Sequence, residues 1–133
     1  MLKPLPSSPS PNPAVPALDA EALGRLTALD PLGESRLLER VLNAFQASAA
    51  RLAPQLEAGR SAADWNAVGL VAHTLKSSSA SIGALALSAL CAQVEAAVRL
   101  GATTGLDADI FAMAAELDLA LQAIERVLRE RSA

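Results

Sequence analysis

The sequence predicts an all-α protein, an antiparallel up-down four-helix bundle with a short N-terminal lid helix. Hydrophobic residues make up 52% of the 133-residue chain but aromatic residues only 2%, and tyrosine is absent. Strands favour β-branched and aromatic side chains, whereas alanine and leucine favour helices. The apolar residues also recur at steps of three and four, the spacing of one helix face. A chain of this length is expected to form one domain.

The first 16 residues are not expected to belong to the helical bundle. Residues 1–16 contain six prolines with serines between them. Proline fixes φ and removes amide donors, so this segment is predicted to be a disordered arm or linker. Residues 17–133 are assigned to the helical bundle.

The lid helix is predicted over residues 19–29. Asp19 is a suitable N-cap, and Leu23 and Leu26 are expected to face the bundle. The aspartate, proline and glycine within residues 30–33 then end the helix.

The first long helix is expected to begin near Glu34 or Ser35. Its apolar positions step alternately by four and three, at Leu38, Leu42, Phe45, Ala49, Leu52 and Leu56. Pro54 predicts a bend with a short continuation to Ala58, and Gly59 is a suitable stop.

Glycines and acidic residues mark the bounds of the remaining three helices. Residues 61–64 resemble a capping box for the next helix, Gly83 predicts a turn, residues 101–105 a loop, and Asp107 an N-cap. The inward positions are predicted to be Ala86, Leu87, Leu90, Val94, Ala97 and Val98 in one helix and Ile110, Ala114, Leu117, Leu121, Ile124 and Leu128 in the last.

The only histidine, His73, is predicted to point to solvent. A helix turns by about 100° per residue, which places His73 roughly 160° from the middle of the apolar stripe of its helix. Lys76 follows one turn later, within reach of the imidazole. The expected docking surface around the ring, small except for one leucine, comprises Gly69, Leu70, Ser77, Ala80 and Ala84. Such an exposed ring suits contact with another protein.

These residues carry a resemblance to a known family. The pattern consists of His73-x-x-Lys76, the small residues after it, Ile82-Gly83-Ala84, Leu87, Leu90, Cys91 and Val94-Glu95. Together it resembles the histidine phosphotransfer (HPt) domain, which relays phosphoryl groups between the aspartates of receiver domains in two-component phosphorelays. The resemblance extends from about Leu18 to the last helix. It departs at Ser77, where many members have glycine.

The resemblance implies a phosphohistidine carrier with no kinase activity of its own. His73 would be the phosphoacceptor and Lys76 would stabilise the charge of the phosphoryl group. Glu95, at the edge of an apolar face, is assigned to orient the ring, with Gln93 as the alternative. The expected partners are response-regulator receiver domains, which would bring Mg²⁺, and a hybrid sensor kinase. The carrier itself would need no cofactor and is expected to be a monomer.

Several other classes of function are disfavoured. A net charge of −3 argues against nucleic-acid binding. A lone histidine without clustered carboxylates does not predict a metal site, and no glycine-rich phosphate loop is present. No apolar run approaches the ~18–20 residues of a membrane span, and a single cysteine suits a reducing compartment, so a cytoplasmic location is expected.

Two alternatives to a receiver-to-receiver carrier stay open. One is a non-catalytic adaptor bundle that binds a receiver or kinase without accepting phosphate. The other is a substrate domain of a chemotaxis kinase, phosphorylated directly by an ATP-binding domain.

Overall fold

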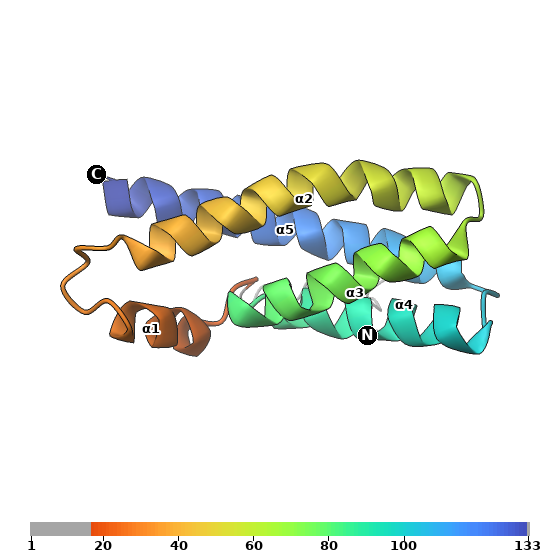
Figure 1. The fold of residues 1–133 in the computed structure, drawn as a ribbon, viewed down its shortest axis with the longest axis horizontal. Coiled ribbons are helices and arrows are strands. Elements are labelled where there is room, and N and C mark those ends of the chain that lie inside the picture. The colour runs from red at the N-terminus through yellow and green to blue at the C-terminus, as the bar shows by residue number, and fades with distance from the viewer. Residues whose placement is uncertain (1–16, 133) are drawn as a thin grey trace, which may run out of the picture.

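The predicted fold class is confirmed. The computed structural model describes residues 17–132, and within them it contains five α-helices and no strand. Their bounds are α1 Ala20–Ala28, α2 Leu37–Ser61, α3 Trp65–Ser81, α4 Leu85–Leu100 and α5 Leu106–Ser132. Helices α2 and α4 each pack against α3 and α5, which gives an antiparallel up-down bundle (Figure 1). The prediction for residues 1–16 lies outside the described residues.

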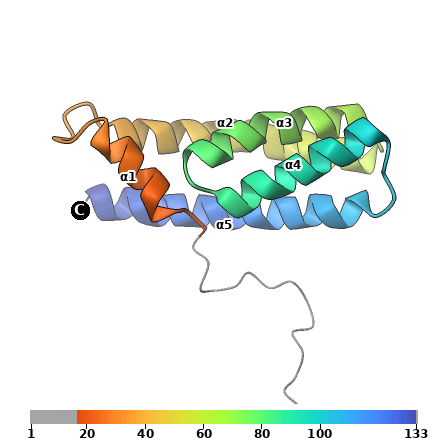
Figure 2. The same ribbon diagram turned by 90° about the horizontal axis from the view of Figure 1, so that it is seen from below.

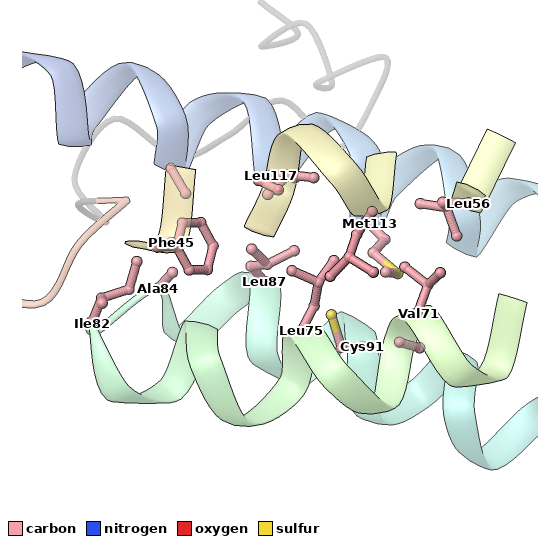
Figure 3. Packing of buried hydrophobic residues seen from close by; sticks show 14 of the residues in the cluster. Phe45, Leu56, Val71, Leu75, Ile82, Ala84, Leu87, Cys91, Met113 and Leu117 are labelled. Atoms are coloured by element: carbon pink, nitrogen blue, oxygen red, sulfur yellow. The ribbon is translucent and has the colours of Figure 1, made fainter. Parts of the chain in front are cut away.

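The apolar faces of the long helices meet in one buried core (Figure 3). Side chains from all four long helices are fully buried, among them Leu42, Leu75, Leu87, Ile110, Met113 and Ile124. Burying one leucine stabilises the fold by about 1.5–3 kcal/mol. Two predicted core positions, Ala86 and Ala114, are wrong, because these alanines are exposed. One residue corresponds to a rotation of about 100°, and the bulkier neighbours Leu87 and Met113 take the inward positions.

Helix α1 covers the end of the bundle where α2 and α5 extend past the α3–α4 hairpin (Figure 2). Asp19 is its N-cap, as predicted, and its carboxylate accepts the N–H of Ala22 at 3.1 Å. The Asp19 N–H donates to the carbonyl of Gly83 at 2.8 Å, and Gly83 has the positive φ of +80° that the turn requires. Leu23 and Leu26 are half-buried against the core. The expected lid helix is therefore present and is tied to the α3–α4 turn.

Helix α2 begins later than predicted. Its first residue is Leu37, not Glu34 or Ser35. Asp30, in the loop after α1, accepts the backbone N–H groups of Leu37 at 3.1 Å and of Ser35 at 3.3 Å. The backbone bond to Leu37 is the largest factor that lowers the pKa of Asp30. The cap of α2 is thus supplied from seven residues upstream, which local sequence spacing does not indicate.

The predicted end of α2 near Gly59 is wrong, because the helix runs through Pro54 to Ser61. Pro54 is exposed, and so is Ala50, whose carbonyl loses its usual helical donor and can bond water instead. Gly59 is buried against α3, where an added Cβ would lie 3.1 Å from Val68 Cγ2. This glycine allows α2 and α3 to approach closely and does not end a helix.

The starts of α3 and α5 differ from the prediction by a few residues. Asp64 is the N-cap of α3 and accepts the N–H of Ala67 at 3.2 Å, whereas Ser61 is the last residue of α2. Asp107 lies in the first turn of α5, one residue after its start, where a carboxylate suits the helix dipole. The loop predicted at residues 101–105 is confirmed.

Candidate functional site

His73 lies on the outer face of α3, as predicted. Its side chain is 65% exposed. The opposite face of the same helix is buried in the core through Val71, Ala72 and Leu75. The helical period therefore places the imidazole in solvent because the apolar residues on either side of it must point inward.

The surface around the ring is mostly as predicted. Leu70, Ser77 and Ala80 are exposed, and these three residues are called the α3 face below. Gly69 is half-buried because α3 lies close to α4 at this point. An added Cβ would be 3.0 Å from Val98 Cγ1, so the absence of a side chain here permits close helix packing.

Ala84 does not belong to the docking surface. It is buried and lies in the same core cluster as Ile82 and Phe45 (Figure 3). Helix α3 ends at Ser81, and the turn at Gly83 directs the chain into α4. The helical period of α3 therefore does not extend to Ala84, which is why its predicted position was wrong.

Glu95, on α4, contacts both candidate functional side chains of α3. Its Oε2 lies 2.5 Å from His73 Nδ1, and its Oε1 accepts a hydrogen bond from Lys76 Nζ at 2.6 Å. Arg99 is a third neighbour, with its guanidinium 3.5 Å from Oε2. Only 11% of the Glu95 side chain is exposed, so little water competes for these contacts.

Gln93, the alternative partner for the ring, lies on a different face of α4. Two residues correspond to a rotation of about 200°, so Gln93 and Glu95 project in nearly opposite directions. Gln93 is exposed, and the ring nitrogen is paired with the carboxylate. Of the two residues considered, Glu95 is the one in contact with His73.

The electrostatics of the site define the role of each ring nitrogen. The hydrogen bond from Lys76, followed by that from His73, lowers the pKa of Glu95 below its ordinary value of 4.5. An ionised carboxylate can only accept hydrogen bonds, so the Nδ1 beside it carries the proton. In the neutral ring the lone pair is then on Nε2. The nitrogen that could act as a nucleophile is therefore the one not held by Glu95.

A groove of about 350 Å³ runs beside the ring between α3 and α4. Its lining residues are Asn66, Gly69, Leu70, His73, Glu95, Val98 and Arg99. Sequence reasoning did not single out Asn66 or Arg99. Arg99 lies four residues after Glu95, and that spacing places it on the same helix face, so it could have been found.

Within residues 17–132, no group of three or more His, Cys, Asp or Glu residues could hold a metal ion. Burial raises the pKa of the Cys91 thiol to about 12, which keeps it protonated and unreactive at neutral pH. None of the helices in this range combines the length and apolarity needed to cross a bilayer.

Comparison with known protein families identifies the family of this chain. Residues 40–127, about two-thirds of the sequence, match the Hpt domain family. The chain belongs to the Hpt domain family. This membership confirms the resemblance carried by the histidine motif, and it supports a role as a phosphotransfer carrier in a phosphorelay.

A solved Hpt structure agrees with this assignment. The chain is similar to the crystal structure of histidine-containing phosphotransfer protein B from Pseudomonas aeruginosa, with a TM-score of 0.75 and 26% sequence identity. The similarity covers 87% of this chain and 97% of that one, so it includes nearly the whole Hpt fold. A comparison with curated protein sequences found no match.

Proposed function

We propose that His73 carries a phosphoryl group between the aspartates of two receiver domains. The observation that carries this proposal is the pairing of Nδ1 with Glu95, which leaves Nε2 free on an exposed ring. A nucleophile that must enter the active site of another protein has to be accessible and in the correct tautomer.

The transfer is an in-line displacement at phosphorus. The Nε2 lone pair of His73 attacks the aspartyl phosphate of the donor, the bond between phosphorus and the carboxylate oxygen breaks, and the carboxylate leaves with the electron pair. The ring gains positive charge while its Nδ1–H stays hydrogen-bonded to Glu95, 2.5 Å away, which stabilises that charge. Transfer to the second receiver reverses these steps. Mg²⁺ on the receiver would neutralise phosphoryl charge.

The site carries excess positive charge for the phosphoryl group. Two cations, Lys76 and Arg99, flank the single carboxylate of Glu95, which leaves one positive charge in the cluster when His73 is neutral. A phosphoryl group brings about −1.5 to −2 charges at neutral pH. We assign Lys76, and with it Arg99, to stabilise that charge by charge-assisted hydrogen bonds.

The proposed partners follow from this chemistry. Response-regulator receiver domains, one of them within a hybrid sensor kinase, would donate and accept the phosphoryl group. The protein would act as a monomer, presenting the α3 face and His73 to each partner in turn. It would depend on its partners for phosphorylation.

Replacement of the histidine tests the proposal. A phosphorylated receiver is incubated with the wild type and with His73→Gln, and the label is tested for the acid lability and alkali stability of phosphohistidine. The wild type is expected to be labelled and His73→Gln is not. Equal labelling of the two, or no labelling of the wild type by any receiver that binds it, would favour the non-catalytic adaptor. Circular dichroism checks that the variant keeps its helices.

A further inference from the structure

A hydrogen bond between two helices lies beside the site. The hydroxyl of Ser88, on α4, donates to the backbone carbonyl of Lys76, on α3, at 2.9 Å. Ser88 is half-buried. Within residues 17–132 this is the one hydrogen bond that a side chain of a bundle helix makes to the backbone of a neighbouring helix.

The Lys76 carbonyl does not depend on this bond for a hydrogen-bond donor. It lies inside α3, where the N–H four residues later is its usual donor, and Ser79 Oγ is also 3.2 Å away. A serine in a helix commonly bonds back to its own helix, as Ser78 and Ser81 do here. The Ser88 hydroxyl instead reaches across to α3. The bond therefore fixes the position of one helix relative to the other.

The bond acts on the turn of α3 that carries the site. Ser88 lies two helical turns before Glu95, about 10.5 Å along the same face of α4. Lys76 is thus held by α4 at two points, its carbonyl by Ser88 and its ammonium by Glu95. His73 precedes Lys76 by three residues. On the other side of His73, Gly69 packs against Val98 of α4, so contacts between the two helices bracket the ring.

We infer that Ser88 is a positioning residue for His73. Its hydroxyl sets the register of α4 against α3 so that the Glu95 carboxylate reaches His73 Nδ1 and Lys76 Nζ together. A shift of one helix along the other by about 1 Å would lengthen these two contacts, now 2.5 and 2.6 Å, to the limit of hydrogen-bond length or beyond it. Without the Ser88 bond, Glu95 holds the Nδ1–H tautomer less often, and Nε2 is less often the free nitrogen. This inference rests on the proposed function of His73.

The test compares three variants with the wild type. Ser88→Ala removes the hydroxyl, and Ser88→Thr keeps it. Ser78→Ala is the matched control, because Ser78 is also a half-buried serine of the hairpin but bonds only to its own helix. The tautomer of His73 is measured from the ¹⁵N shifts of its ring, and the rate of phosphorylation by a phosphorylated receiver is measured in parallel.

Ser88→Ala is expected to lower the ratio of the Nδ1–H to the Nε2–H tautomer and the phosphorylation rate by about threefold to tenfold, the factor that one ordinary hydrogen bond represents. Ser88→Thr should restore both, and Ser78→Ala should change neither. The inference is overturned if Ser88→Ala keeps the wild-type tautomer ratio and rate, even if its melting temperature falls, because the bond would then be purely structural. Label that persists in His73→Gln would refute the proposed function instead, so the two failures are distinguishable.

Discussion

A shielded carboxylate distinguishes His73 from an ordinary surface histidine. The ring is 65% exposed, but the Glu95 side chain that holds its Nδ1 is only 11% exposed. Charge-assisted hydrogen bonds are stronger where water is kept away from one partner. The same carboxylate also binds Lys76, so a single residue of α4 fixes the proposed nucleophile and the neighbouring cation.

Removal of this carboxylate should impair phosphotransfer without unfolding the protein. Glu95→Ala frees the ring to adopt the other tautomer and leaves Lys76 without its partner. We expect the rate of phosphorylation by a receiver to fall by about tenfold to a hundredfold, the range for loss of one hydrogen bond to a charged group. Gln93→Ala, an exposed position on the same helix, is the control and should keep the wild-type rate.

Titration of Glu95 itself should not alter the effect of Glu95→Ala between about pH 6 and 8. The pKa of Glu95 is lowered in the folded protein, chiefly by Lys76, so the carboxylate stays ionised across this range. The ion pairs of Glu95 add stability that is fully present when the pH is above its ordinary pKa of 4.5. This stability is lost as the pH falls through the lower pKa that Glu95 has in the folded protein. A variant with a wild-type rate and tautomer at pH 7 would show that Glu95 does not orient the ring.

The sequence predicted the exposure of His73, the proposed nucleophile, more accurately than the contacts around it. The exposure of His73 and the proximity of Lys76 follow from the period of one helix, which the sequence contains directly. The contact with Glu95 depends on the register between two helices, set here by Ser88 and by the packing at Gly69. Helical spacing within a single element cannot supply that register, so Glu95 and Gln93 remained alternatives.

At the scale of the element, helix α3 keeps one face bare. The α3 face has no side chain larger than leucine, so a receiver can approach His73 closely. Ala80→Trp should obstruct this approach while the helix persists, because Ala80 is exposed. We expect the rate of phosphorylation by a receiver to fall by about tenfold to a hundredfold, because a small misplacement of reacting groups lowers a rate by such a factor. Labelling by a small donor such as phosphoramidate should continue.

The matched control is Ala115→Trp, which places the same side chain on an exposed position of α5. It should leave both reactions unchanged. Equal losses in the two variants would mean that tryptophan harms the bundle in general, and no loss in Ala80→Trp would remove Ala80 from the docking surface.

The existence of each helix was predicted more accurately than its first and last residues. All five were expected, because apolar residues recur at helical spacing in each. The errors occur where packing overrides a local signal. Gly59 resembles a stop but is needed for the approach of α2 to α3, and Pro54 is tolerated because its side of the helix faces water. Such choices depend on which residue of another helix lies opposite.

At the scale of the molecule, the α3–α4 hairpin is the unit on which the site depends, and α1 is attached to its turn. An added Cβ at Gly83 would lie 2.8 Å from the backbone N of Asp19 and 2.9 Å from Ala22 Cβ. Gly83 therefore serves two purposes, since it adopts the positive φ of the turn and leaves room for α1. The lid and the hairpin should unfold together.

A pair of glycine substitutions separates these two purposes. Gly101 also has a positive φ, of +71°, but nothing lies within 4 Å of an added Cβ there. Gly101→Ala should lower the free energy of unfolding by about 1–2 kcal/mol, the cost of a left-handed conformation. Gly83→Ala should lower it by about 2–5 kcal/mol, because displacement of α1 adds a packing cost of about 1–3 kcal/mol. Urea denaturation measures both values. Equal losses would show that α1 is not held against the turn, whereas a larger loss at Gly83, with faster amide exchange at Asp19, would establish that the lid is part of the cooperative fold.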